Sequence, residues 1–179
     1  GVTATDNCDT NVDITWNQTR TDGPCADTYT LTRVWTATDN CGNTSTSSQV
    51  IQVRDITAPV LANIPANITV ECSAVPTLGQ NGVTATDNCD SDVQVTWTEN
   101  RTDGACTDSY TLTRVWTATD NCGNTTTLSQ TITVQDVTAP VLANIPANVT
   151  VECDAVPNLG LNGVTATDNC DTNVDITWN

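Results

Sequence analysis

Cysteine and aspartate are the residues of this sequence that could do chemistry, and they recur at regular spacings. The hexapeptide TATDNC occurs five times, and its copies start alternately 33 and 48 residues apart. Its cysteines are Cys8, Cys41, Cys89, Cys122 and Cys170. The four other cysteines are Cys25, Cys72, Cys106 and Cys153. Thiols held at suitable distances form disulfides, and carboxylates gathered in space bind a hard cation such as Ca²⁺.

The two spacings add up to a period of 81 residues that covers the whole sequence. Residues 1–81 and 82–162 align without a gap and differ at 20 positions, and residues 163–179 repeat residues 1–17. One period has the size of a small domain. The sequence therefore predicts tandem domains, with the boundary near Pro59, which cannot donate a ladder hydrogen bond. The predicted segments are 1–54 (the C-terminal two-thirds of a repeat), 55–135 (a complete repeat) and 136–179 (the N-terminal half of a third), a window from a longer array.

Composition excludes several classes of protein. The formal net charge is −16, with 21 acidic residues against five arginines, so nucleic acid is not expected as a partner. No run of 18 apolar residues is present, so no membrane span is predicted in this region. Nine cysteines with no histidine and no CxxC pair favour disulfides over zinc, and hence an oxidising, extracellular compartment. The lack of histidine also disfavours an enzyme.

Alternating short runs in the complete repeat predict strands. They are separated by pieces rich in Asn, Asp and Gly. About seven such strands in about 80 residues are typical of an antiparallel β-sandwich of immunoglobulin type. The fold class is therefore predicted as all-β, with tandem, disulfide-linked sandwiches. The clearest runs are Ile68–Cys72, Val83–Thr86, Val93–Thr98, Tyr110–Thr119 and Ser129–Val134.

The strands also predict a disulfide pairing. In such a sandwich two facing strands reach the same end, which would bring Cys89 near Cys122. Residues 110–119 would span about 33 Å as a strand, at about 3.3 Å per residue, whereas bonded cysteines need Cα atoms within about 7 Å. Cys106, before that strand, cannot easily reach Cys122, after it. The predicted pairs are Cys8–Cys41, Cys72–Cys106 and Cys89–Cys122.

Three cysteines are left over by this pairing. Cys25, Cys153 and Cys170 are predicted to have partners outside residues 1–179. A sequential pairing, Cys72–Cys89 with Cys106–Cys122, stays open if the intervening strands are broken.

The same geometry gathers aspartates near the linker that begins the repeat. Their carboxylates would repel one another unless a cation such as Ca²⁺ were bound, and Ca²⁺ is the one cofactor that the sequence suggests. The alternative is that these side chains only form Asx-turns and accept backbone N–H bonds. No EF-hand spacing decides between the two. The candidate ligands are Asp55, Asp87 and Asp120, with Asp136 and Asp168 in the next copy.

Arg114 departs from the alternation of its strand, because it lies on the same face as Trp116. The expected arrangement packs its aliphatic stem against the tryptophan and extends the guanidinium to the edge. A direct role in binding is the weaker interpretation. Arg33 is the copy of this residue in the preceding period.

Three motifs carry a resemblance to a known family: DITAPVLANIPANITVEC (Asp55–Cys72), VTATDNCD (Val83–Asp90) and YTLTRVWTATDNCGN (Tyr110–Asn124). They resemble the hyalin-repeat (HYR-like) group of immunoglobulin-like modules. More narrowly, they are similar to tandem repeats of very large surface adhesins of Bacteroidota, including gliding-motility adhesins. The resemblance implies a location outside the cell, on a bacterial surface.

The function expected from these observations is structural. The chain is predicted to be the repeat region of an extracellular bacterial surface adhesin or filament, a stiff disulfide-stabilised stalk for adhesion or gliding motility. Its expected partners are neighbouring repeats, with other copies in a fibre and an unknown surface glycan or protein as further candidates. The alternative is a glycan- or protein-binding module that uses exposed loops such as Asn100–Asp108.

Overall fold

Strands account for nearly all the regular structure of the chain. A computed structural model describes residues 1–158, 160 and 163–177. Within these residues it contains eleven strands, one short 3₁₀ helix (η1, Cys72–Ala74) and no α-helix. The all-β prediction is confirmed. No described helix has the length and hydropathy that crossing a membrane requires.

The first period forms a three-stranded antiparallel sheet. Its strands are β1 (Asp13–Asp22), β2 (Tyr29–Thr38) and β3 (Thr44–Val53), hydrogen-bonded in that order. The register places Trp16 opposite Trp35, and Tyr29 opposite Val53. The β1–β2 loop therefore lies at the end of the sheet where β3 finishes and the chain passes into the next period.

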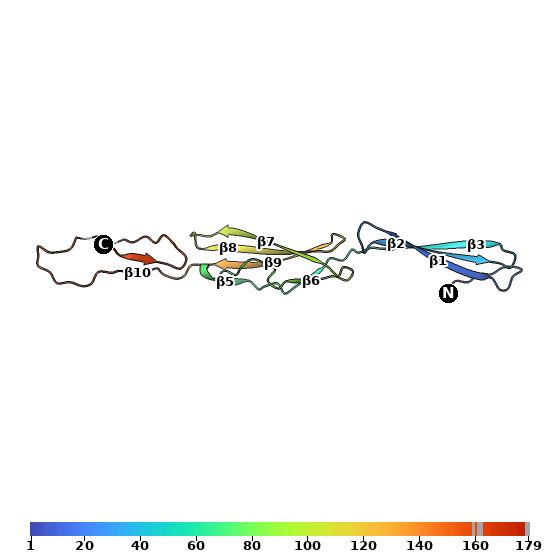
Figure 1. The fold of residues 1–179 in the computed structure, drawn as a ribbon, viewed down its shortest axis with the longest axis horizontal. Helices are drawn as coiled ribbons and strands as arrows, with labels where there is room; N and C mark the ends of the chain where they lie inside the picture. Colours follow the sequence, from blue (N-terminus) through green and yellow to red (C-terminus); the bar gives the residue numbers. More distant parts are fainter. Residues whose placement is uncertain (159, 161–162, 178–179) are drawn as a thin grey trace. The chain divides into compact units, whose positions relative to one another are not determined.

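The complete repeat forms two sheets. One pairs β4 (Val60–Ala62) with β6 (Thr84–Thr86), and the other has four strands in the order β5-β9-β8-β7 (Figure 1). The bounds of these four are Ile68–Val70 for β5, Gln94–Asp103 for β7, Tyr110–Thr119 for β8 and Thr125–Val134 for β9. The pairing of β5 with β9 is parallel, an exception to the expected antiparallel pattern. Strands β6 and β8, which carry the two copies of TATDNC, lie in different sheets, as expected for a sandwich.

The last described strands repeat the first pair of the complete repeat. β10 (Val141–Ala143) pairs with β11 (Thr165–Thr167), and each residue pair lies one period after the equivalent pair of β4 and β6.

The described chain divides into two compact units that do not coincide with the sequence periods. The first contains residues 1–62, 83–96 and 117–127, and the second contains residues 63–82, 97–116 and 128–179. In the second, Leu112, Ile132 and Val134 are buried, and Ile68 and Val70 pack against them. In the first, Leu61, Val83 and Ala118 are buried. Each unit thus has apolar contacts of its own, and each contains one of the linkers between periods. The boundaries 1–54, 55–135 and 136–179 stay predictions.

Arg114 lies deeper than the sequence predicts. Its side chain is 2% exposed, so the guanidinium does not extend to solvent. Nε donates to Glu99 Oε2 at 2.7 Å, and the terminal nitrogens donate to the carbonyls of Pro76 and Thr77. In the same loop, Gly79 O accepts from Trp116 Nε1 at 3.1 Å. Arg114 and Trp116 therefore hold the 76–79 segment against the sheet.

Candidate functional site: the joints between repeats

The residues singled out by the sequence gather at two joints. Counted from linker to linker, the first period is residues 1–54, the second is residues 55–135 and the third is residues 136–179. The first joint is the region around the linker Asp55–Pro59, where the first period meets the second. The second joint is the region around the linker Asp136–Pro140, where the second period meets the third. The first joint lies inside the first compact unit and the second joint inside the second.

The two DNC turns of one repeat lie together, as predicted. Asp90, which follows the early turn, accepts a hydrogen bond from the backbone N–H of Asn121 in the late turn, at 2.9 Å. The first period makes the same contact, at 2.9 Å, between Asp9 and Asn40. Asp90 and Asp9 are each 9% exposed. A buried carboxylate therefore fixes the two strand ends to each other in both copies.

Every aspartate of these turns accepts local backbone hydrogen bonds, as the Asx-turn interpretation requires. Asp87 Oδ1 accepts from Cys89 N at 2.8 Å and from Asp90 N at 3.1 Å. Asp120 Oδ1 accepts from Cys122 N and Asn124 N, and its Oδ2 accepts from Asn124 Nδ2 at 2.8 Å. Burial raises the pKa of Asp120, but the hydrogen bonds from Asn124, Cys122 and Gly123 together bring it below its usual value. Both oxygens of Asp120 are thus already used.

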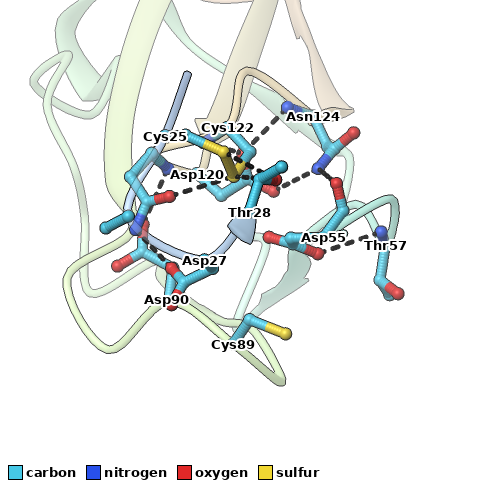
Figure 2. Close-up of a disulfide and its surroundings, with 12 residues drawn as sticks. Cys25, Asp27, Thr28, Asp55, Thr57, Cys89, Asp90, Asp120, Cys122 and Asn124 are labelled. Atoms are coloured by element: carbon cyan, nitrogen blue, oxygen red, sulfur yellow. Dashed lines mark hydrogen bonds between the residues drawn. A yellow bond between two sulfur atoms is a disulfide. The ribbon is translucent and has the colours of Figure 1, made fainter. Parts of the chain in front are cut away.

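A disulfide crosses the first joint. Cys25, in the β1–β2 loop of the first period, is bonded to Cys122, in the β8–β9 turn of the second, with Cα atoms 5.1 Å apart (Figure 2). Thr28 Oγ1 lies 3.1 Å from Cys25 Sγ and 3.8 Å from Cys122 Sγ. Beside the bridge, Asn121 Nδ2 donates to Asp27 Oδ2 at 2.6 Å. The loop of one period and the turn of the next are therefore joined covalently and by a hydrogen bond.

A second, different disulfide crosses the second joint. Cys72, at the start of η1, is bonded to Cys170 of the following period, with Cα atoms 5.7 Å apart. The preceding residue, Glu71, extends to the next linker, where its Oε1 accepts from Val137 N at 3.3 Å and from Thr138 Oγ1 at 3.2 Å. A carboxylate of one period thus holds the linker of the next.

These bonds correct the predicted pairing. Cys122 is bonded to Cys25 and not to Cys89, and Cys72 is bonded to Cys170 and not to Cys106. The sequential pairs Cys72–Cys89 and Cys106–Cys122 are excluded by the same two bonds. Cys25 and Cys170, predicted to have partners outside residues 1–179, have partners within them. The described cysteines without a partner are Cys8, Cys41, Cys89, Cys106 and Cys153, so the pair Cys8–Cys41 is not formed either.

The error came from confining each bridge to one period. Strand length correctly excludes Cys106 as the partner of Cys122, but the prediction assigned Cys25, one period earlier than Cys106, a partner outside residues 1–179. The signal was in the predicted topology. A hairpin loop lies at the end of the sheet where the chain leaves for the next domain, whereas the DNC turns lie where it enters. Cysteines at opposite ends of one repeat therefore meet between successive repeats.

Three of the five predicted aspartates, Asp55, Asp87 and Asp136, belong to clusters of possible ligand atoms at the joints. At the first joint, ligand atoms of Asp55, Asp87 and Cys89 lie within 4.8 Å of one another. At the second joint, those of Glu71, Asp136 and Cys170 do so, and Asp168 Oδ1 accepts from Cys170 N at 2.8 Å. Glu71 is the member of this set that the sequence analysis missed. Burial, followed by the charges of Asp55 and Asp87, raises the pKa of the Cys89 thiol, so the thiol is favoured over the thiolate.

One comparison with known proteins gives a match in the middle of the chain. Residues 60–134 match the family model described as an HYR-like domain with 4 cysteines. No curated protein matches the chain. The family match agrees with the immunoglobulin-like fold of this segment. A disulfide-bonded HYR-like domain indicates an extracellular, adhesion-type repeat.

Proposed function

We propose that this chain is the load-bearing repeat region of a bacterial cell-surface adhesin or filament, acting as a stalk in adhesion or gliding motility. The observation that carries the proposal is that both disulfides join successive 81-residue periods and neither lies within one period. A bridge inside a domain stabilises that domain alone. A bridge between domains resists their separation, which is the property that a stalk under tension needs. The proposed role is structural rather than catalytic.

The two bridges overlap along the chain, and this shortens the path that carries force. Without them, tension between Cys25 and Cys170 would draw out about 145 residues. With them, two routes run in parallel: from Cys25 along the chain to Cys72 and over its bridge, or over the Cys25–Cys122 bridge and along the chain to Cys170. Each route has about 48 residues. At about 3.5 Å per extended residue, the reach falls from about 500 Å to about 170 Å.

The proposal also accounts for the unpaired cysteines. Cys106 and Cys153 are the copies of Cys25 and Cys72, whose partners belong to the following period. Cys41, Cys89 and Cys8 are copies of Cys122 and Cys170, whose partners belong to the preceding period. At the same separations along the chain, each of the five would bond to a cysteine in a repeat that flanks residues 1–179. Every joint of a longer array would then be closed by two bridges.

The alternative, a glycan- or protein-binding module that uses the loop Asn100–Asp108, is less well supported. In the preceding period the copy of this loop contains Cys25 and Asp27, which bind the next repeat at the first joint. The loop thus has a structural partner in the array. A ligand for the adhesin would bind elsewhere in the chain or in another domain.

Stretching single molecules between their termini tests the load-bearing role. The oxidised chain is expected to extend about 340 Å less on full unfolding than the chain in reductant, because about 98 residues are bypassed. A variant with Cys106→Ser and Cys153→Ser is the control and should behave as the parent does. Equal extension with and without reductant would contradict the proposal.

A further inference from the structure

Two carboxylate oxygens are buried at the first joint without a hydrogen-bond partner. They are Asp55 Oδ2 and Asp87 Oδ2. Asp55 as a whole is 7% exposed. The other oxygen of each residue serves its turn, since Asp55 Oδ1 accepts from Thr57 N at 3.2 Å and Asp87 Oδ1 accepts from Cys89 N. The Asx-turns therefore explain one oxygen of each side chain and leave the second unexplained.

Burying a carboxylate oxygen with no donor or cation is costly, and two close together repel each other as well. No cationic side chain relieves the pair, because the ion pairs within the described residues join Arg20 to Asp22, Arg101 to Asp103 and Arg114 to Glu99. The Asp55 and Asp87 ligand atoms lie within 4.8 Å of each other. Two oxygens that each lie about 2.3–2.6 Å from one Ca²⁺ are at most about 5 Å apart. The spacing fits a shared ion.

We propose that Asp55 and Asp87 bind one Ca²⁺ at the first joint, through the two buried Oδ2 atoms. The inference rests on the proposed load-bearing function, to which it adds regulation by a divalent cation. Carboxylates are hard ligands that suit Ca²⁺, and two of them leave most of its six to eight positions to water and carbonyl oxygens. Cys89 is not a ligand in this proposal, because its copy Cys170 is bonded to Cys72 and sulfur suits softer metals.

The second joint repeats the signature independently. Asp168, the copy of Asp87, also leaves its Oδ2 buried without a partner. Asp136, the copy of Asp55, lies there with Glu71, a residue of the preceding period. An ion at this joint would therefore be held by residues of both periods. Asp120 is excluded as a ligand at the first joint, because turn amides and Asn124 occupy both of its oxygens.

Calorimetric titration of the oxidised 179-residue chain with CaCl₂, and melting with Ca²⁺ or EDTA, tests the site. The parent should bind Ca²⁺ and melt several degrees higher with Ca²⁺ than with EDTA. The double variant Asp55→Asn/Asp87→Asn should bind one ion fewer per chain. In EDTA this variant should melt higher than the parent, because the repulsion between the two carboxylates is removed.

Asp120→Asn is the matched control, since it alters a carboxylate of the same joint that already has its partners. It should lower the melting temperature equally in Ca²⁺ and in EDTA and leave the number of bound ions unchanged. Absence of binding heat and of a Ca²⁺-dependent melting shift in the parent would overturn the proposal. An unchanged ion count in the double variant would also overturn it. Neither result affects the stretching experiment, which depends only on the disulfides.

Discussion

The strands Tyr29–Thr38 and Tyr110–Thr119 consist of the same ten residues, YTLTRVWTAT, yet they differ in burial. In the first period every residue of the strand is partly exposed. In the second, Leu112, Arg114, Trp116 and Ala118 are buried in alternation. The local sequence therefore sets the strand, while burial depends on the segments that surround it. Among the residues that the structure describes, the 76–79 segment lies over the face of the second copy and is bonded to Arg114 and Trp116.

The cysteines show the same difference between identical positions. Cys25 and Cys106 occupy equivalent loops, and within the described residues Cys25 is bonded to the next repeat's turn whereas Cys106 is not bonded. Residues 1–179 thus contain matched pairs in which one residue contacts a neighbouring repeat within these residues and its copy does not. Substitutions at both members of such a pair separate the local contribution of a residue to the free energy of unfolding from its contribution through the joint.

Removal of one bridge is expected to have the largest effect. Cys25→Ser should lower the free energy of unfolding by about 4–5 kcal/mol, the contribution that the chain-entropy model gives a loop of about 100 residues. The separation of Cys25 and Cys122 is 97 residues. Chemical denaturation under oxidising conditions measures the change. Cys106→Ser, at the equivalent unpaired position, should leave stability unchanged, and an equal loss in both variants would mean that the effect is local.

The two arginines are expected to differ almost as strongly. Arg114→Ala should cost about 3 kcal/mol, because it leaves Glu99 and two loop carbonyls without their buried donor. Among the described residues, Arg33 donates one side-chain hydrogen bond, to Gln18, and that bond is exposed to solvent. Arg33→Ala should therefore lower the free energy of unfolding by less than about 0.5 kcal/mol. Urea denaturation of both variants provides the comparison. Similar costs would show that the 76–79 segment does not stabilise the second copy.

Sequence alone predicted the parts of the fold that depend on local pattern. Alternation gave the strands, and the recurrence of TATDNC correctly placed the two DNC turns at one end, where Asp90 now links them. It also brought Asp55 and Asp87 together. These predictions succeed because a strand's direction and its turn are set by adjacent residues.

Sequence did not predict contacts that depend on which copy of a residue is used. In a chain with an 81-residue period, Cys25 and Cys106 occupy equivalent positions in similar loops, so pattern cannot choose between them as partners. The path of the linker makes the choice, because it sets the exit loop of one repeat against the entry turns of the next. The burial of Arg114 was missed for a related reason, since it depends on Pro76 and Thr77, which are distant in sequence.

Acid should produce the smallest effect. The side chain of Asn43, and then its backbone N–H, donate hydrogen bonds that lower the pKa of Asp39. Backbone hydrogen bonds from Cys170 and Asp171 lower the pKa of Asp168. A carboxyl whose folded pKa is lowered contributes stability above its unfolded value of 3.8, and loses it as pH falls through the folded value. The melting temperature should therefore be steady from pH 7 to about pH 5 and fall below about pH 4.

Asn43→Ala tests the cause directly. Without the Nδ2 donor at 2.6 Å, the pKa of Asp39 should rise toward 3.8, so the stability that Asp39 loses in acid should be smaller, and its loss should be complete at a higher pH than in the parent. Carboxyl chemical shifts followed by NMR from pH 6 to pH 2 measure this pKa. Asn124→Ala is the matched change at Asp120, where burial opposes the lowering of the pKa by hydrogen bonds, so the pKa of Asp120 in this variant should lie above that of Asp39 in Asn43→Ala. The opposite order would mean that the neighbouring repeat does not influence the turn.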